Sequence, residues 1–509
     1  MYDQKILIID YGSQYTQLIA RRVRENNTFC EVLNPDSINQ LQNVIGVILS
    51  GGPSSVVKNN DYDLPDIIFE KNIPILGICF GMQLLCKKFK SEVKEASSRE
   101  YGKAILEIKK DVKIFDGLNK KLEVWMSHGD SVIKVPENFS IIASTNKKSL
   151  SAIKLNNKEV YGIQFHPEVS HTLDNGKIIY NFVHKICNSK KIWTTKNIIN
   201  NQIKKIQKKV GKDNVILGLS GGVDSSVAAA IIHKAIKNQL TCIFIDNGLL
   251  RLNEMQQVKE GFSAFNNINI VYVNSSKLFL DRLKNITDPE EKRKIIGRSF
   301  IDVFQSEAKK LKNAKWLAQG TIYPDVIESA AASSNAHLIK SHHNVGGLPK
   351  NMDLNLLEPL RELFKDEVRS LGINLGVDQK LINRHPFPGP GLAVRIVGEV
   401  KKEYLDILRQ ADNIFITMLH EKNLYTQISQ AFTVFMPIKS VGVTGDGRSY
   451  GNVVSLRAVK TIDFMTAKPF NFPFDFLEEV STRIINEVPN ISRVCLDISS
   501  KPPATIEWE

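Results

Sequence analysis

Short apolar runs alternate with longer mixed stretches over the first part of the chain. Four such runs are residues 6–9, 47–49, 75–78 and 161–165. This pattern is typical of the buried strands of a parallel sheet, with helices between them. Ligands bind beyond the carboxyl ends of such strands. Because Cys79 and His166 each follow one of these runs, we expect both residues to lie at the same edge of the sheet.

The same alternation begins again after residue 214. Three further apolar runs are residues 215–219, 240–245 and 316–319. They predict a second parallel sheet, and residues 227–232 suit a helix placed shortly after its first strand. The chain is therefore predicted to be an α/β protein, with a second ligand-binding edge at the carboxyl ends of the strands in its second half.

Length and composition limit the classes to consider. At 509 residues the chain is too long for one core, so two to four domains are expected. With 42% hydrophobic residues the chain is globular and not disordered. The first residues lack a signal-peptide pattern, and no apolar run approaches the roughly 18–20 residues that span a bilayer. We expect a cytoplasmic protein without a membrane partner.

The net charge of +13 raises the question of a nucleic-acid partner. The densest lysines lie between residues 190 and 212, where Ile199, Ile203, Ile206 and Val210 recur at helical spacing. This favours a solvated helix face at a domain boundary, with an interdomain or phosphate-binding role as the alternative. We expect no nucleic-acid partner.

Six cysteines are scattered without C-x-x-C pairs, which argues against a disulfide framework and a zinc site. Only Cys79 lies between glycines at the end of an apolar run. Gly77 and Gly81 leave room for a tight strand-to-helix turn, which would expose the sulfur at the sheet edge. The positive end of the following helix favours the thiolate, a strong nucleophile.

His166 and Glu168 follow another predicted strand. We expect His166 to act as general base and acid and Glu168 to orient its imidazole, which completes a triad with Cys79. Backbone amides of Gly51, Gly52 and Phe80 are the candidates for holding an oxyanion. A cysteine at a strand end is more often simple core packing, but its occurrence with the His-Pro-Glu segment and the glycine-rich loop favours the catalytic alternative.

These segments resemble the class I glutamine amidotransferase domain over about residues 1–190. The resemblance implies an α/β amidotransferase fold and glutamine as a substrate. It also implies a glutamine pocket formed in part by residues 10–14. The other pocket residues implied are Gln83, His128, Gly129 and Asp130.

A phosphate-binding segment follows the run at residues 215–219. Its residues are Ser220, Gly221, Gly222, Val223, Asp224, Ser225 and Ser226. Glycines let backbone amides approach phosphate oxygens, and the following helix presents its N-terminus to the anion. The segment lacks the lysine of a Walker loop and instead resembles the PP-loop of ATP pyrophosphatases. That resemblance implies ATP as a substrate, AMP and pyrophosphate as products, and Asp224 as a ligand of Mg²⁺.

The ends of the neighbouring predicted strands complete the ATP site that the resemblance implies. Asp246 and Gly320 lie at these ends. Residues 340–348 look like a mobile lid, in which Lys340 is the candidate for stabilising phosphate charge. A metal site at His342 and His343 is the alternative, but no cysteine or carboxylate lies at ligand spacing.

Taken from end to end, the chain resembles the family of glutamine-hydrolysing GMP synthetases, with the Lys-Pro-Pro…Glu-Trp-Glu ending as a further match. The family implies an amidotransferase at residues 1–190, a PP-loop domain at residues 191–384 and a small α+β domain at residues 385–509. It implies that xanthosine monophosphate (XMP) is adenylated by ATP and then aminated to GMP, and that the last domain forms a homodimer. The XMP contacts it implies are Arg251, Arg384, Gln430, Lys501 and Glu507.

Two other classes remain open at this point. Another PP-loop enzyme, such as an NAD synthetase or a tRNA-thiolating enzyme, would share the phosphate segment. A nucleic-acid-binding regulator would account for the positive charge but not for the triad, and a salt-dependent gel-shift assay separates it from an enzyme.

Overall fold

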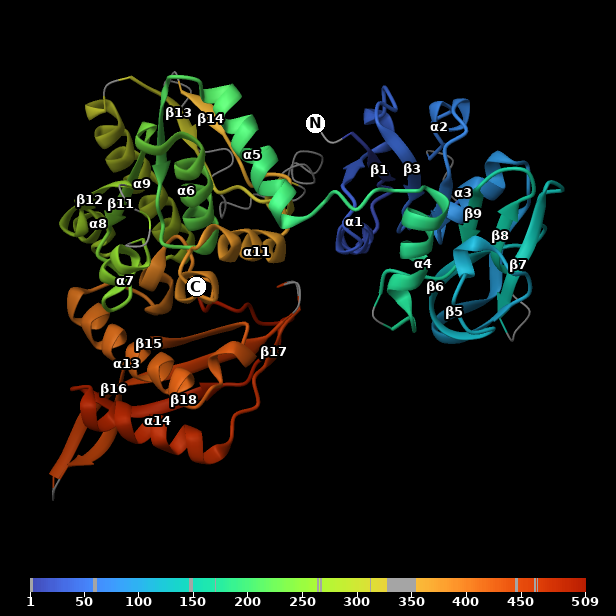
Figure 1. Cartoon of the computed structure of the whole chain (residues 1–509). Coiled ribbons are helices and arrows are strands. Elements are labelled where there is room, and N and C mark those ends of the chain that lie inside the picture. Colours follow the sequence, from blue (N-terminus) through green and yellow to red (C-terminus); the bar gives the residue numbers. More distant parts are fainter. Residues whose placement is uncertain are drawn as a thin grey trace. The chain divides into compact units, whose positions relative to one another are not determined.

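The computed structural model describes residues 3–57, 62–145, 150–169, 171–262, 265, 268–311, 313–326, 354–444, 447–461, 464 and 466–509. The chain divides into two compact units, Met1–Asn197 and Ile198–Glu509 (Figure 1). We describe each unit by itself.

The first unit contains a nine-stranded sheet in the order β2-β1-β3-β4-β9-β8-β7-β5-β6. The strands β2, β1, β3, β4 and β9 pair in parallel, and β8, β7, β5 and β6 add antiparallel pairs. The strands are β1 (Lys5–Ile9), β2 (Cys30–Leu33), β3 (Val44–Leu49), β4 (Ile75–Ile78), β5 (Val93–Ile108), β6 (Lys121–Val132), β7 (Phe139–Thr145), β8 (Leu150–Leu155) and β9 (Val160–Ile163). The helices are α1 (Thr16–Glu25), α2 (Ile67–Glu70), α3 (Phe80–Lys88) and α4 (Asn175–Tyr180).

Burial separates the two kinds of strand in this sheet. All four residues of β4 and all four of β9 are buried, as expected of central parallel strands covered on both faces. β6 instead alternates, with every second residue buried from Leu122 to Val132. The inward positions are apolar up to Met126 and then become His128 and Asp130. The pleat therefore carries two polar side chains to the buried face at one end of this strand.

The predicted parallel strands of the first unit are confirmed, although β9 ends at Ile163, two residues before the predicted end. The sequence analysis did not predict the antiparallel half of the sheet. In β6 the buried apolar positions alternate with partly exposed ones, so this strand does not form a continuous apolar run.

The second unit begins with α5, and a five-stranded parallel sheet follows in the order β12-β11-β10-β13-β14. Its strands are β10 (Asn214–Gly218), β11 (Leu240–Asp246), β12 (Asn269–Asn274), β13 (Ala314–Ala318) and β14 (Asn355–Leu357). Its helices are α5 (Thr195–Val210), α6 (Val223–Ile236), α7 (Glu254–Gly261), α8 (Ser276–Leu283), α9 (Pro289–Lys310), α11 (Lys365–Leu375) and α12 (Gln379–Ile382). The three predicted strands and the helix after the first of them are confirmed.

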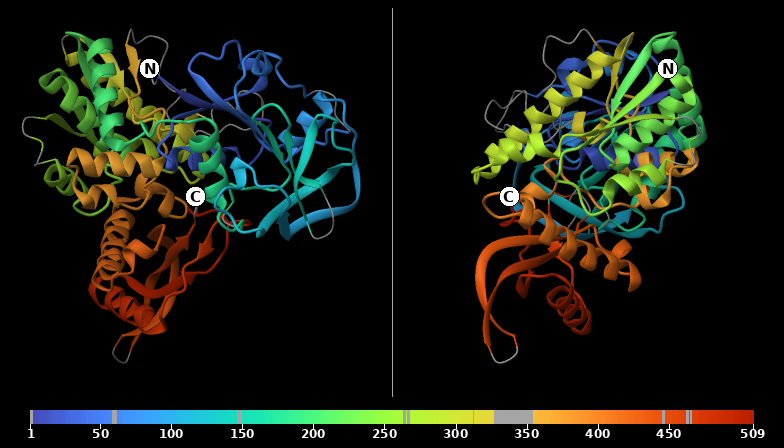
Figure 2. Two further views of the ribbon diagram at one scale, coloured as in Figure 1. Left: turned by 45° about the vertical axis from the view of Figure 1, so that its right-hand side comes forward. Right: turned by 90° about the vertical axis from the view of Figure 1, so that its left-hand side faces the viewer.

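An antiparallel hairpin forms most of a second sheet in the same unit. β15 (Gln430–Thr444) pairs with β16 (Gly447–Lys460), which also pairs with β17 (Lys468–Pro469) and, in parallel, with β18 (Ile491–Asp497). The helices α13 (Lys402–Glu421) and α14 (Phe474–Glu487) contact each other and this sheet, and they lie against the same face of it (Figure 2).

One apolar core runs through the second unit. It joins Ile243 and Phe304, which lie in and against the parallel sheet, to Phe415 of α13 and Val480 of α14. The turn η5 (Gly391–Arg395) contributes buried residues at the junction. Because the core is continuous, the parallel sheet and the last sheet hold each other in place. Side chains from both halves can therefore form one site.

Helix α5 carries the lysines that the sequence analysis assigned to a solvated face. Ile199, Ile206 and Val210 are buried, whereas the lysines at positions 204, 205, 208 and 209 are exposed. The helical prediction and the solvated face are confirmed. Among the described residues, no helix is both long enough and apolar enough to cross a membrane. All six cysteines are free thiols.

Candidate active sites

Cys79 occupies a strained turn between β4 and α3. Its φ of 52° and ψ of −104° lie in a region that residues other than glycine rarely adopt. The turn needs glycine on both sides: a Cβ on Gly77 would lie 2.7 Å from the backbone of Gly81, and a Cβ on Gly81 would lie 2.5 Å from the carbonyl oxygen of Leu49. The fold thus holds the sulfur in one place at the carboxyl end of the sheet.

His166 and Glu168 lie beside Cys79, because β9 pairs with β4 and ends at the same edge. The Nδ1 atom of His166 is 2.7 Å from Oε1 of Glu168, and the two side chains are 4% and 0% exposed. Burial of the ring opposes its charge, but Glu168 and a hydrogen bond to the Cys79 thiol raise the pKa of His166 well above its ordinary value. The geometry places the sulfur of Cys79 against an imidazole that Glu168 holds in position.

Two further groups contact the sulfur. The side-chain amide of Gln164 lies 3.6 Å from Sγ of Cys79, and the thiol lies 3.7 Å from the carbonyl oxygen of Ser127, which it can reach as donor. Gln164 was not among the residues predicted from the sequence. Its only signal was its place directly after β9 and two residues before His166, which lies outside the regular alternation of the strand.

The glycine-rich loop after β3 reaches the same place. A Cβ on Gly51 would lie 3.3 Å from the His166 ring, and a Cβ on Gly52 would lie 3.0 Å from the ring of Phe80. Among the described residues, no backbone hydrogen bond outside helices and strands uses the amides of Gly52 or Phe80. These amides lie beside the nucleophile, as an oxyanion site requires.

Three of the expected glutamine-pocket residues, Gln83, His128 and Asp130, form one connected group. The Gln83 amide donates to the carbonyl oxygen of Asp130 at 3.0 Å and Ser55 donates to the Asp130 carboxylate at 2.7 Å. Nδ1 of His128 lies 3.0 Å from the Asp130 carbonyl oxygen. Burial lowers the pKa of His128, although Glu100 opposes the shift. Gly129 lies between these two residues on β6, on the less buried face.

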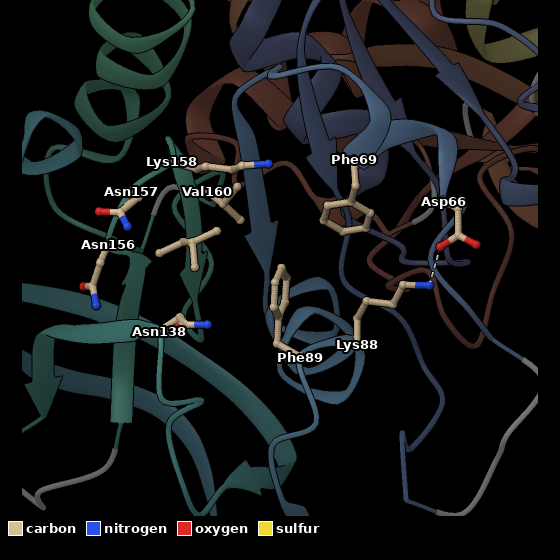
Figure 3. Close-up of a pocket in the computed structure, with 10 residues that line it drawn as sticks. Asp66, Phe69, Lys88, Phe89, Asn138, Asn156, Asn157, Lys158 and Val160 are labelled. Carbon is tan, nitrogen blue, oxygen red and sulfur yellow. Dashed lines mark hydrogen bonds and ion pairs between the residues drawn. The ribbon is translucent and has the colours of Figure 1, made fainter.

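A cavity of about 550 Å³ lies in the first unit, but not at the triad. It is lined by Phe69, Phe89 and Val160 among others, with Lys88 paired to Asp66 at 2.5 Å (Figure 3). Val160 begins β9 and Phe89 follows the end of α3, so this cavity lies at the amino ends of the parallel strands. It is therefore separated from the carboxyl edge that carries Cys79.

In the second unit, the phosphate-binding segment links β10 to α6. Gly221 has a φ of 75°, and its backbone amide and carbonyl direction depend on that left-handed conformation. The hydroxyls of Ser220 and Ser225 lie 3.0 Å apart, and Ser220 accepts from the amide of Gly222 at 3.3 Å. Val223 is the first residue of α6, so the loop ends at the positive end of this helix.

Asp224 is the residue of this segment that fits a divalent cation. Its Oδ2 lies 2.6 Å from Nζ of Lys365, whereas its Oδ1 is buried with no hydrogen-bond partner among the described residues. The hydroxyl of Ser226 is also buried and has no partner there. A single carboxylate together with substrate phosphates is a common way to hold Mg²⁺. In the part of the chain that the structure describes, no cluster of three or more His, Cys, Asp or Glu residues suits a metal.

The other ATP candidates lie at the same edge. A Cβ on Gly320 would lie 2.9 Å from the backbone of Asp224, so the segment after β13 packs directly on the phosphate loop. Asp246 ends β11 and accepts from the amide of Gly248 at 2.9 Å. Lys340 and the rest of the expected lid, with His342 and His343, lie outside the described residues.

Three arginines of the second unit are each paired with a carboxylate. Arg384 lies 2.6 Å from Glu254 and also donates to the carbonyl oxygen of Gly221 at 3.2 Å. Arg251 lies 3.3 Å from Asp412, with side chains 11% and 3% exposed. Burial lowers the pKa of Arg251, although Asp412 opposes the shift. Its Nη2 has no hydrogen-bond partner among the described residues.

The third arginine, Arg395, is fully buried and holds Glu507 through two hydrogen bonds of 2.9 and 3.1 Å. Gln430 donates to the same carboxylate at 2.7 Å. The guanidinium carbons of Arg395 and Arg251 lie 5.0 and 4.8 Å from the centre of the Phe387 ring. Four of the five XMP candidates thus belong to one connected cluster.

Lys501 is the exception. Its Nζ donates to the carbonyl oxygen of Phe464 at 2.7 Å, and the structure gives it no contact with the other four candidates. The sequence analysis also missed Asp412, Glu254 and Arg395. A detectable signal existed for Asp412, because an acidic residue interrupts the apolar face of α13 between Leu408 and Phe415.

Comparison with known sequences assigns the chain to a family. Three family profiles match successive parts of the chain: "Glutamine amidotransferase class-I" at residues 7–186, "NAD synthase" at 195–274 and "GMP synthase C terminal domain" at 417–508. A Francisella philomiragia protein named as a glutamine-hydrolysing GMP synthase is 57% identical over 514 residues, which cover 100% of this chain and 99% of that protein. The chain belongs to the glutamine-hydrolysing GMP synthase family.

Further members of the GMP synthase family match in the same way. Proteins of that name from Aliivibrio fischeri and Vibrio vulnificus are each 55% identical over 513 and 514 residues, and both matches cover 100% of this chain and 99% of the relative. The full-length match decides against the two open alternatives, a different PP-loop enzyme and a nucleic-acid-binding regulator. The NAD synthase profile matches only the part of this chain that includes the phosphate-binding segment, and this supports ATP as a substrate.

Proposed function

We propose that the chain forms GMP from XMP in two half-reactions, one in each compact unit. The overall reaction converts ATP, XMP, L-glutamine and water to AMP, diphosphate, GMP and L-glutamate. The observation that carries this proposal is the presence, on one chain of this family, of a thiol–imidazole–carboxylate triad and a phosphate-binding loop.

The first unit releases ammonia. The Cys79 thiolate attacks the carboxamide carbon of glutamine, and the amides of Gly52 and Phe80 stabilise the oxyanion that forms. His166 then gives its proton to the departing ammonia, and Glu168 holds the imidazolium in position. Water hydrolyses the glutamyl thioester with His166 as base, which restores the thiolate. Gln83, His128, Gly129 and Asp130 form part of the pocket that recognises glutamine.

The second unit activates the acceptor. The C2 oxygen of XMP attacks the α-phosphorus of ATP, and diphosphate leaves into the loop formed by residues 220–226. The loop amides and serine hydroxyls bind the leaving group. Asp224 would hold Mg²⁺, and this ion would supply positive charge that neutralises the phosphates. Ammonia then attacks C2 and displaces AMP. Asp246, Gly320 and Lys340 complete the ATP site in this proposal.

The acceptor contacts follow from the arginine cluster. Arg251 and Arg384 supply positive charge for the phosphate of XMP. Gln430, Lys501 and Glu507 are proposed to contact the acceptor from the last third of the chain. The buried Nη2 of Arg251 supports the assignment, because a phosphate oxygen would give it the partner that it lacks among the described residues.

We further propose a domain organisation, an oligomeric state and a cellular location for the protein. Domains at residues 1–190, 191–384 and 385–509 are proposed to correspond to amidotransferase, ATP pyrophosphatase and acceptor-binding functions. The last domain is proposed to form a homodimer, and the exposed apolar residues Ile438, Val441 and Val443 of β15 support this. Nucleotide substrates and six free thiols support a cytoplasmic location.

Replacement of Cys79 tests the division of labour. We expect Cys79→Ala to lower glutamine-dependent GMP formation by at least about 10³-fold, because the nucleophile is lost. GMP formation from ammonium salt should remain within about twofold of the wild type, because that reaction bypasses the thiol. Steady-state assays with glutamine or ammonium as the only nitrogen source measure both rates.

Cys86→Ala is the matched control. Cys86 is a buried thiol on α3, the helix that follows Cys79, and burial raises its pKa to about 12, which disfavours the thiolate. Equal loss of both reactions in Cys79→Ala, or loss of the glutamine reaction in Cys86→Ala, contradicts the proposed roles.

A further inference from the structure

The last three residues of the sequence are held by buried cations of the second unit. Arg395 binds the carboxylate of Glu507, as described above. Two residues later, the carboxylate of Glu509 accepts from Lys292 and from the amide of Gly398, the latter at 2.8 Å. Arg293 also donates to a backbone oxygen of Glu509. The segment from Glu507 to Glu509 is thus fixed at both ends.

Lys292 is unusual for a lysine because its side chain is 0% exposed. It lies in the first turn of α9, beside the parallel sheet that carries the phosphate-binding loop. Burial lowers the pKa of Lys292, while the hydrogen bond to Glu509 opposes that shift. Each of the three hydrogen atoms of its ammonium group has an acceptor, which offsets part of the cost of burying the group.

The other two acceptors of Lys292 are the carbonyl oxygens of Ala393 and Ile396, at 3.3 and 2.9 Å. These two residues flank Arg395 in the sequence. One ammonium group therefore binds the backbone on both sides of Arg395 and the side chain two residues after Glu507. The same lysine therefore contacts chain segments next to both members of the Arg395–Glu507 pair.

A purely stabilising role explains this arrangement poorly. Replacing a buried ion pair by apolar residues of similar size is often neutral or stabilising, so burial of Lys292 and Glu509 is a costly way to gain stability alone. Hydrogen bonds from one fixed point to two separate chain segments set their separation instead. The distance between Arg395 and the Glu507 segment is the quantity that these bonds control.

We propose that Lys292 is a positioning residue for the acceptor site, acting through Glu509 and the turn around Arg395 to place the Glu507 carboxylate. This inference rests on the proposed contact between Glu507 and XMP. It assigns to helix α9, in the nucleotide-binding half of the unit, control over a segment that binds the other substrate.

Kinetics with ammonium as nitrogen source test the proposal on the full chain. Lys292→Met removes the ammonium group and keeps the rest of the side-chain length, and Glu509→Gln removes the side-chain charge of the partner. We expect each variant to raise the KM for XMP at least about tenfold, because small displacements of a binding group have large effects. The KM for ATP should stay within about twofold. The KM of the double variant for XMP should lie within about twofold of that of the single variant with the larger effect. Both substitutions break the same ion pair, so their effects should not add.

Lys294→Met is the matched control on the same helix. Lys294 is 58% exposed and its nearest carboxylate, that of Glu290, is 3.9 Å away, so neither KM should change. Glu507→Gln serves as the reference and should raise the KM for XMP. If Glu507→Gln leaves that KM unchanged, the proposed role of Glu507 fails, and the inference fails with it.

If Glu507→Gln acts as expected but Lys292→Met and Glu509→Gln leave the KM for XMP unchanged, only the positioning role is overturned. A parallel rise of the KM values for XMP and ATP also overturns it, because a general loss of structure has that effect. Circular dichroism checks the fold of each variant. Should Lys292→Met not fold, Glu509→Gln alone decides the question by the same criterion.

Discussion

The two sites of the chain are organised in opposite ways. In the first unit the reacting groups contact one another directly: His166 lies 2.7 Å from Glu168, its pKa reflects a hydrogen bond to Cys79, and the backbone at Cys79 is strained. In the second unit the charged side chains near the phosphate loop contact other charged protein groups. Asp224 faces Lys365 at 2.6 Å, and Arg384 faces Glu254 at the same distance.

The difference follows from the chemistry that each site performs. A covalent nucleophile must be activated before its neutral substrate arrives, so the triad is assembled from protein groups alone. A site for two nucleotides must hold concentrated positive charge, which is costly in the interior unless carboxylates balance it. The paired arginines therefore keep charge in place, and in the proposed function a phosphate would bind donors that the carboxylates leave unused, such as Nη2 of Arg251 among the described residues.

Among the substitutions that test this difference between the two sites, replacement of Glu168 should change the rate of GMP formation most. We expect Glu168→Gln to lower glutamine-dependent GMP formation by about 10³-fold, because the imidazolium loses the charge that orients and stabilises it. Ammonium-dependent GMP formation should not change. Single-turnover release of glutamate from glutamine measures the loss. A loss below about tenfold would mean that the first site does not depend on its preassembled geometry.

Replacement of Asp224 should have the next largest effect, confined to the second unit. We expect Asp224→Asn to raise the Mg²⁺ concentration for half-maximal ammonium-dependent GMP formation at least about tenfold, because a neutral amide binds a hard cation weakly. Titration of Mg²⁺ at saturating ATP and XMP provides the measurement. Asp302→Asn is the control, since Asp302 is 55% exposed and pairs with Arg282 on the surface. An unchanged Mg²⁺ requirement would remove Asp224 from the proposed site.

The smallest expected effect concerns pH and the stability of the first unit. Because Glu168 and Cys79 raise the pKa of His166 above 6.5 in the folded state, in spite of burial, its charge stabilises the fold fully below about pH 6.5. This stabilisation is lost as the pH rises through the folded-state value. Urea unfolding should therefore show Glu168→Gln to be less stable than the wild type by about 2 kcal/mol near pH 5.5, with a smaller difference near pH 9. A difference that is constant with pH would contradict the assignment of charge to His166.

The sequence predicted those features that depend on local pattern. Continuous apolar runs identified the central strands of both parallel sheets, and glycine spacing indicated the turn at Cys79. The antiparallel strands β5 to β8 were not predicted, and in β6 the reason is that apolar residues alternate with polar ones and form no continuous run. His128 and Asp130 were assigned to the glutamine pocket only through family resemblance, whereas the structure shows why they face inward.

Long-range pairings lay beyond the sequence. Asp412 is 161 residues from Arg251, and Glu509 is 217 residues from Lys292, so no local spacing connects either pair. The carboxylates that hold the arginines were therefore missed, although Arg251 and Arg384 themselves were named. Among the described residues, Lys501 has no contact with the other acceptor candidates, so its role in binding XMP stays a prediction.

Strand β6 changes from apolar to polar along its inward positions while the sheet geometry stays regular. Each side chain's face on such a strand depends on whether its position is odd or even. A substitution at position 128 alters one contact, but a single inserted residue between positions 122 and 128 would turn both His128 and Asp130 outward together. This stretch of chain can therefore vary in chemistry far more easily than in length.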